Sequence, residues 1–290
     1  MTTKKETQST EVAEVKGGVV APLFLSDEDF VGGGFEGADS DSFAIPFLQI
    51  LQKMSPICDA EDPRYVEGAK AGHFYNTVTG EIIDGKTGAL IIPCAFRRSF
   101  IRWGGRESSE GGFKGEITVE EFEKMKLDPT QAVQVDGRWY APDEKGEVNE
   151  KKSDYFADTR SHYVLLVNEE TGEFGQALLS LASAQIKASK MLLTALNQKK
   201  VKTPGGLKTP PTFANMVRLT TQGMKNEKGN WSGAVFSLEG LVTDANLFEN
   251  AKAFYKDIIS GQVEVDYNKA DQGSASGADT EAKPQDADNF

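Results

Sequence analysis

The sequence predicts a mainly β fold with a few helices (α+β), arranged as an OB-like Greek-key barrel with insertions. Roughly eight to ten short segments rich in β-branched and aromatic residues are separated by Gly, Asn and Asp turn signals. Helical periodicity is confined to a few segments, and no internal repeat has a fixed period. A β-sandwich is the alternative that the same pattern allows.

Five segments are expected to form strand pairs around turn signals. Within Gly88–Trp103 two strands are expected to part near Pro93. Within Val133–Tyr140, Asp136-Gly137 fits the type I′ turn of a hairpin. The segments are, in order, Tyr75–Ile83, Gly88–Trp103, Val133–Tyr140, Ser161–Leu181 and Phe213–Val242.

Three segments are expected to form helices, two of them with an apolar face that packs on a core. Thr118 and Glu121 form the pattern of a capping box, and the helix that it starts is expected to end before Pro129. Ser183 and Asp244 are the expected caps of the other two helices. These two are expected over Ser183–Asn197 and Ala245–Ile258.

Both ends of the chain differ in composition from its middle. Residues 1–42 predict a disordered arm and residues 261–290 a disordered acidic tail, which leaves residues 43–260 as one folded domain. The whole chain has a net charge of −12, of which Met1–Asp41 contributes −6 and Gly261–Phe290 contributes −5, so the part between them carries −1. The overall acidity therefore does not exclude a nucleic-acid ligand for the domain.

Positive charge is concentrated in Leu181–Asn230, which has a net charge of +8 and Glu227 as its single acid. Lys199–Pro211 is expected to be a mobile basic loop within it. Most charge runs are solvated surface, but here few acids are available to neutralise the cations, which favours salt-sensitive binding of phosphates. The basic residues are Lys187, Lys190, Lys199, Lys200, Lys202, Lys208, Arg218, Lys225 and Lys228, and Trp231 follows them.

Ala95–Arg106 combines four arginines with three aromatic residues and contains no acid. If 95–103 is a strand, Phe96, Arg98, Phe100 and Arg102 lie on one face and Arg97, Ser99, Ile101 and Trp103 on the other. Neither face is expected to form a dry core, because burying unpaired arginines costs on the order of several kcal/mol. The pattern favours stacking of bases on rings and binding of phosphates by cations; a solvated edge strand with paired arginines is the alternative.

Other function classes have weak support. No apolar run reaches the roughly 18–20 residues of a membrane span, the N-terminus lacks the apolar region of a signal peptide, and two cysteines indicate a reducing, cytoplasmic compartment. Cys58, Cys94, His73 and His162 lack the short paired spacings of a zinc site, and His162 is expected to be a packing residue. No phosphate-binding glycine loop and no nucleophile motif is present, so we expect neither catalysis nor a cofactor.

These observations predict a protein that binds single-stranded DNA without strong sequence preference. Two other roles stay open: a recombination protein that anneals strands, and a structural or assembly protein. The residues expected to contact DNA are Tyr75, Phe96, Arg97, Arg98, Phe100, Arg102, Trp103, Arg106, Lys187, Lys190, Lys199, Lys200, Lys202, Arg218, Lys225, Lys228 and Trp231.

Several segments together resemble the single-stranded-DNA-binding proteins of tailed bacteriophages. They are IPFLQILQKMSP (45–56), GAKAGHFYNTVTGEI (68–82), FRRSFIRW (96–103), SHYVLLV (161–167), SAQIKASKMLLTAL (183–196) and PPTFANMVRLTT with NEKGNWSGAVF (210–236). The resemblance covers about residues 43–260. It implies an OB-fold barrel, cooperative coating of phage DNA during replication or recombination in the host cytoplasm, and contact with phage DNA polymerase or recombination proteins.

The tail is similar in character to the acidic tails of the T7-type group and of bacterial single-stranded-DNA-binding proteins, although it is more dilute in acids. It ends in Asp286-Ala-Asp288-Asn-Phe290. Its negative charge could compete with DNA for the basic surface, and Asp286, Asp288 and Phe290 are the expected contacts with partner proteins. A merely solubilising tail is the alternative.

Overall fold

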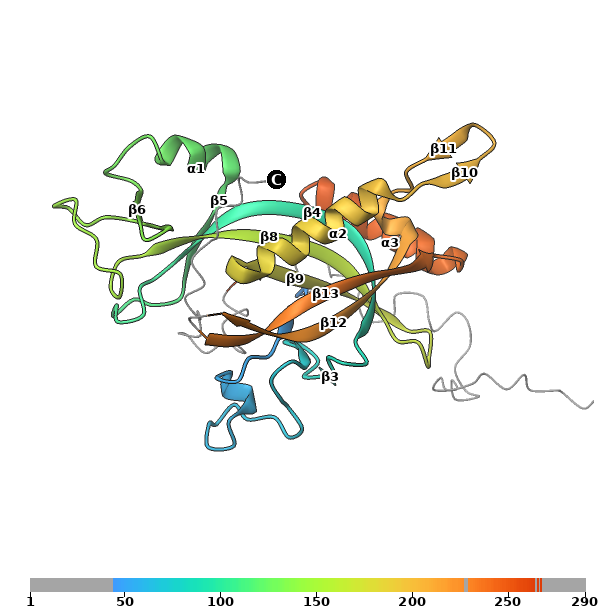
Figure 1. The fold of residues 1–290 in the computed structure, drawn as a ribbon, viewed down its shortest axis with the longest axis horizontal. Helices are drawn as coiled ribbons and strands as arrows, with labels where there is room; N and C mark the ends of the chain where they lie inside the picture. The colour runs from blue at the N-terminus through green and yellow to red at the C-terminus, as the bar shows by residue number, and fades with distance from the viewer. Residues whose placement is uncertain (1–43, 227–228, 264, 266, 268–290) are drawn as a thin grey trace, which may run out of the picture.

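The computed structural model describes residues 44–226, 229–263, 265 and 267, which form a mainly β protein with three helices in the described part (Figure 1). Its centre is a pair of long antiparallel strands, β4 (Ala89–Trp103) and β8 (Tyr155–Val167). They pair along their whole length, from Leu90 opposite Val167 to Trp103 opposite Tyr155. The mainly β expectation is therefore confirmed.

Shorter strands extend this pair on both sides into an eight-stranded sheet. Near the start of β4 the strand order is β13-β12-β4-β8-β9, and near its end the order is β5-β4-β8-β7-β6. The added strands are β5 (Phe113–Thr118), β6 (Val133–Val135), β7 (Arg138–Tyr140), β9 (Phe174–Ala182), β12 (Asn215–Asn226) and β13 (Gly229–Leu241).

The sheet does not close into a hydrogen-bonded barrel, because the described residues of β13 and β9 do not pair with each other. Other groups cover the open edges. Phe47, next to β1 (Leu48–Ile50), forms a parallel bridge with Leu178 of β9. The side-chain amides of Gln52 and Gln185 bond to the backbone of Ser232 in β13. The expected OB-like Greek-key barrel is therefore not confirmed.

Smaller elements surround the main sheet. β1 pairs with β2 and β2 with β3, while β10 and β11 form a hairpin that projects from one end of the molecule (Figure 1). These elements are β2 (Phe74–Asn76), β3 (Ile82–Ile83), β10 (Val201–Thr203), β11 (Gly206–Lys208), and the 3-10 helices η3 (Pro56–Cys58), η4 (Ser183–Gln185) and η5 (Thr212–Ala214).

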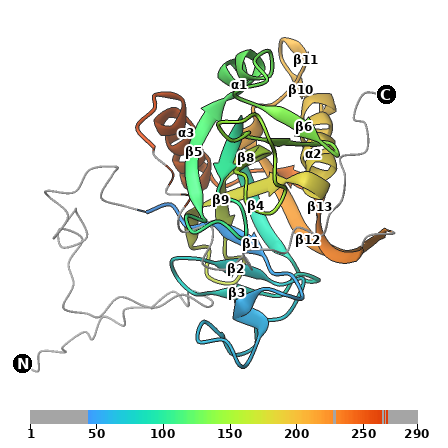
Figure 2. The ribbon, with the colours of Figure 1, turned by 90° about the vertical axis from the view of Figure 1, so that its left-hand side faces the viewer.

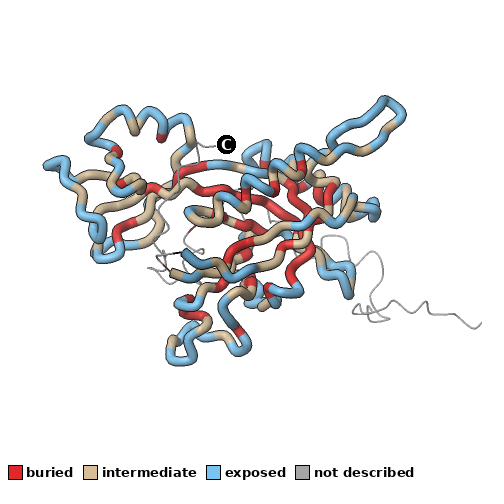
Figure 3. The backbone as a smooth tube through the Cα atoms, viewed as in Figure 1, coloured by how far each residue is buried: buried red, intermediate tan, exposed pale blue. Residues whose placement is uncertain are grey.

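The helices bury opposite faces of the sheet, as Figure 2 shows for α2 (Ile186–Gln198) and α3 (Ala245–Ile259). On the α2 side, Leu192 and Leu196 of α2 pack with sheet residues such as Val164. On the α3 side, Phe254 and Ile258 pack with another group of sheet residues. The short helix α1 (Val119–Met125) covers the far end of the sheet. The buried residues, red in Figure 3, are concentrated in the sheet and in the parts of the helices that pack on it.

Local signals predicted most of the turns and caps. The capping box of Thr118 and Glu121 is present, Asp136 and Gly137 have the positive φ angles of a type I′ turn, and the Asp244 carboxylate accepts from the Leu247 N–H at 2.7 Å. No described helix is both long and apolar enough to cross a membrane.

Three local expectations were wrong. Gly88–Trp103 is one strand with a bulge between Pro93 and Ala95, where the register shifts and the strand still continues. Lys199–Pro211 contains the β10–β11 hairpin instead of a loop. Ser183 does not cap α2, since it has a φ of 50° and begins the preceding 3-10 helix.

Candidate nucleic-acid interface

Phe96 is the exposed aromatic residue of β4 on the α2 side of the sheet. Its side chain is 37% exposed, and its ring centroid lies 5.1 Å from that of His162. His162 is buried, and its Nε2 lies 2.7 Å from the Ser189 hydroxyl of α2. Burial, together with the nearby Arg160 charge, lowers the pKa of His162 to about 4. His162 is thus a neutral packing residue that supports the Phe96 ring, as expected from the sequence.

Farther along the same face, the expected absence of a dry core was wrong. Phe100 is 5% exposed and its ring stacks on Phe122 of α1, with centroids 3.8 Å apart. The reason is that α1 folds over this part of the strand and supplies an apolar partner. In this arrangement Phe100 does not offer a surface to a base.

The other face of β4 points toward α3. Ile101 is fully buried there, and Trp103 is half-buried with its ring edge-on to Phe113 at 6.1 Å. The Arg97 guanidinium lies 5.8 Å from the ring centroid of Tyr163 and forms no ion pair with a described carboxylate. Period two therefore separates Arg97 and Trp103 from Phe96 and Arg98, as predicted, and the two sets lie on opposite sides of the sheet.

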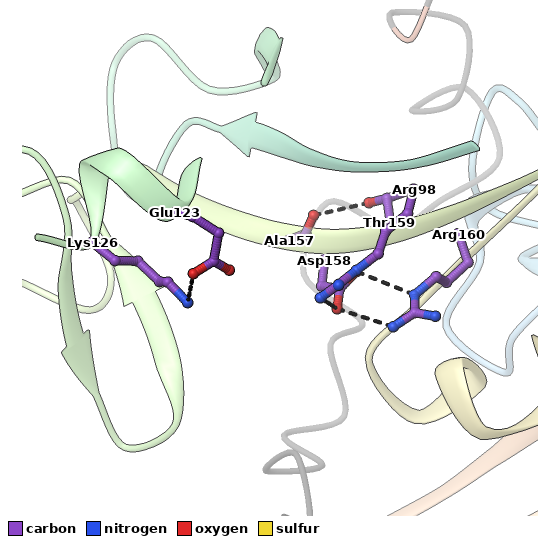
Figure 4. A network of polar contacts seen from close by, with 7 residues as sticks. All are labelled: Arg98, Glu123, Lys126, Ala157, Asp158, Thr159 and Arg160. Atoms are coloured by element: carbon purple, nitrogen blue, oxygen red, sulfur yellow. Dashed lines mark hydrogen bonds and ion pairs between the residues drawn. The ribbon is translucent and has the colours of Figure 1, made fainter. Parts of the chain in front are cut away.

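Arg98 and Arg160 share the carboxylate of Asp158 between α1 and α2 (Figure 4). Arg98 donates to both oxygens, at 3.0 and 2.8 Å, and Arg160 approaches them at 3.3 and 3.4 Å. Burial alone would raise the pKa of Asp158, but the hydrogen bonds from both arginines hold it below its usual value. Two guanidinium groups against one carboxylate leave a local excess of positive charge.

Two further predicted arginines are also paired with acids. Arg102 forms an ion pair with Asp154 at 2.8 Å. Arg218 of β12 lies between Glu169 and Glu239, which raise its pKa through hydrogen bonds. These arginines are therefore largely neutralised. The pairing of Arg102 matches one part of the alternative for Ala95–Arg106, but β4 pairs on both sides and is not an edge strand.

The lysines differ from the arginines. Lys187 and Lys190 are exposed on α2, and neither forms an ion pair with a described carboxylate. The same holds for Lys200, Lys202, Lys208 and Lys225. Lys199 donates to the Gly240 carbonyl at 2.7 Å, and Lys200 bonds to Thr209. The cations without carboxylate partners therefore run along α2 and the β10–β11 hairpin and reach the end of β12.

The remaining predicted residues do not join this surface as one group. Trp231 is half-buried in β13, Tyr75 is half-buried against the small cluster around Leu51, and Arg106 is exposed beyond the end of β4. Lys228, Asp286, Asp288 and Phe290 lie outside the described residues.

Sequence reasoning missed Arg160. Its backbone pairs directly with Arg98, and it shares a face of β8 with Asp158 two residues before it. The spacing of Asp158 and Arg160 was a usable signal, but only once the register between β4 and β8 was known.

Among residues 44–226 and 229–263, no group of three or more His, Cys, Asp and Glu side chains could hold a metal ion. Residues 15–264 match the model of a protein family described as Pam3 phage gp34-like protein. No curated protein and no solved structure matches the chain.

Proposed function

For this chain, which belongs to the Pam3 phage gp34-like protein family, we propose that it binds single-stranded DNA on the α2 side of its sheet and so has a role in phage DNA metabolism. The protein acts by binding, without catalysis. The observation that carries the proposal is the set of exposed lysines without carboxylate partners on α2 and the adjoining strands.

Those lysines suit a polyanion. An exposed lysine that already forms an ion pair gains little from a phosphate, because it must first release its carboxylate. Lys187 and Lys190 carry no such carboxylate among the described residues, and they lie one turn apart on the exposed face of α2. Phosphates spaced along a flexible single strand can follow such a row and release the counterions that surround it.

Phe96 supplies the stacking surface in this proposal. Its ring is exposed, and the buried His162 holds it from behind. The ring lies on the same side of the sheet as α2, since His162 bonds to Ser189 of that helix. One exposed ring beside a row of cations is the combination that binds single strands with little sequence preference.

The strand order supports an OB-like assignment for the part of the sheet near α2. The order β9-β8-β4-β12-β13, with α2 joining β9 to β12, matches a five-stranded OB barrel with a helix between its third and fourth strands. OB barrels are partly open, and their ligands lie between the loop after the first strand and the loop before the last. In this chain those loops are residues 104–154 and the tip of the β12–β13 hairpin.

The test is a titration of labelled oligo(dT) with the full chain at several salt concentrations, followed by fluorescence anisotropy. We expect log K to fall linearly with log salt, by roughly 0.7 for each phosphate contacted. Lys187→Gln with Lys190→Gln should reduce that slope by about 1.4. Lys256→Gln changes an exposed lysine on α3, at the opposite side, that forms no ion pair with a described carboxylate; it is the control and should leave the slope unchanged. No binding at low salt, or equal effects of the two variants, would overturn the proposal.

A further inference from the structure

The two ends of the long axis of the molecule carry opposite charge. The β10–β11 hairpin projects at one end, and α1 with its neighbouring strands forms the other (Figure 1). Lys199–Pro211, which contains the hairpin, holds four lysines and no acid, whereas residues 104–154 at the α1 end have a net charge of −5. Each end therefore presents the charge that the other end attracts.

Each end also exposes a leucine. Leu207 on the hairpin is 72% exposed, opposite Lys202 in the strand register and next to Lys208 in the chain. The hairpin is a separate two-stranded sheet, and no contact among the described residues buries this apolar side chain.

At the other end, Leu127 lies two residues after the last residue of α1 and is 85% exposed. Glu120 and Glu123 on α1 are exposed and form ion pairs with Lys124 and Lys126. Single exposed leucines are ordinary on protein surfaces. Here, however, the charges near Leu207 are all lysines, whereas acids outnumber lysines near Leu127, so the two ends differ in the sign of their charge. The acids are Glu120, Glu121, Glu123 and Asp128, and the lysines are Lys124 and Lys126.

We propose that copies of this chain associate head to tail, with the β10–β11 hairpin of one copy docked on the α1 end of the next. In Figure 2, which looks along the long axis, α1 and the hairpin lie at nearly the same height, so a shift along that axis brings them together. The contact joins two different patches. It is heterologous, leaves a free patch at each end, and builds open chains of copies.

This inference goes beyond the proposed function, since the contact needs no DNA. It is tested with the full chain alone at low salt, by sedimentation velocity over a range of concentrations. The wild-type protein is expected to increase in mass with concentration, and added salt should reverse the increase because the charges are exposed. A wild-type protein that stays monomeric throughout overturns the proposal.

Charge reversal gives the decisive test. The hairpin variant Lys202→Glu with Lys208→Glu and the α1 variant Glu120→Lys with Glu123→Lys should each associate about tenfold or more weakly, because like charges then face each other. An equimolar mixture should regain open-ended association of alternating variants, since the two wild-type patches are complementary in charge and so are the two reversed patches. One chain with all four substitutions should regain open-ended association.

Lys70→Glu with Lys86→Glu, which reverses two exposed lysines elsewhere, is the control and should associate like the wild type. Thermal unfolding checks that each variant is folded. If folded variants associate like the wild type, if the mixture associates no more strongly than either variant alone, or if the control fails to associate, the head-to-tail contact is wrong.

Discussion

Phe96 and His162 face each other across β4 and β8 with ring centroids 5.1 Å apart, yet Phe96 is 37% exposed and His162 only 1%. One ring is therefore a surface group and the other is its buried support. Ser189 fixes the imidazole from α2, so the exposed ring is held in place from below. This arrangement limits the entropy that Phe96 would lose on stacking with a base.

We expect Phe96→Ala to weaken oligo(dT) binding by about 1–3 kcal/mol, the usual value of one base–ring stack. The fold should lose less than the roughly 3–5 kcal/mol of a fully buried Phe→Ala change, because 37% of the Phe96 side chain is already exposed. Anisotropy titration and urea unfolding measure the two quantities. Tyr65→Ala removes an exposed ring elsewhere and is the matched control. Equal losses of DNA affinity in the two variants would contradict a stacking role for Phe96.

His162 predicts a pH dependence of stability. Its folded-state pKa is lowered to about 4, chiefly by burial, whereas the unfolded residue titrates near 6.5. The unfolded chain therefore takes up the proton first. Stability from this group is fully present above about pH 6.5 and is lost as the pH falls toward 4.

Between pH 7 and pH 5 the loss from this one group should be about 2 kcal/mol. Urea unfolding at both pH values measures it, and His162→Gln removes the titrating group while its amide can still bond to Ser189. The variant should be less stable than the wild type at pH 7 but lose less stability on acidification. If both proteins lose the same amount, His162 is not the source of the dependence.

The sequence predicted correctly those features that depend on a few neighbouring residues. The capping box at Thr118 and the turn at Asp136-Gly137 need only a few neighbouring residues, and both were predicted correctly. The β10–β11 hairpin was missed because lysines and glycines make its short strands look like a loop, although Gly206 adopts a positive φ there.

The candidate site was predicted less well, because its partners are distant in sequence. The aromatic and basic alternation of β4 was correct, but the acid that neutralises Arg98 lies 60 residues away on β8, and the ring that buries Phe100 comes from α1. Neither contact follows from the segment itself. The composition of Leu181–Asn230, in contrast, identified the exposed lysines correctly, since scarcity of acids is visible without the fold.

Because Arg98 and Arg160 share the carboxylate of Asp158, we expect one substitution there to lower stability and raise DNA affinity. Asp158→Asn leaves Arg98 and Arg160 without a counter-charge, so the fold should lose about 1–3 kcal/mol. DNA affinity should rise at low salt, and the slope of log K against log salt should steepen by roughly 0.7 to 1.4 as one or two new phosphate contacts form. Anisotropy and urea unfolding test both effects.

The control for that change is Asp62→Asn, which breaks an exposed pair with Arg64 away from α1 and α2. It should alter neither DNA affinity nor the salt slope. An unchanged slope in Asp158→Asn would mean that the freed arginines do not reach the bound strand, and would confine the interface to the lysines.

Gln185 stabilises the open edge of the sheet at β13 through its side-chain amide. Its amide donates to the Ser232 carbonyl and accepts from the Ala234 N–H, both at 2.9 Å, and so takes the place of a missing neighbouring strand. Gln52 also bonds to the Ser232 carbonyl, at 3.1 Å, so Gln185→Ala leaves mainly the Ala234 N–H unpaired. An unpaired buried donor costs about 1–3 kcal/mol, which urea unfolding should detect.

Removing both amides should expose the edge further. Gln52→Ala combined with Gln185→Ala should lose more stability than the sum of the two single variants, because only then does the Ser232 carbonyl lack both partners. The exposed Gln222→Ala on β12 is the control and should stay within about 0.5 kcal/mol of the wild type. Strict additivity of the two losses would mean that the amides act separately, and that neither replaces the other at the edge of β13.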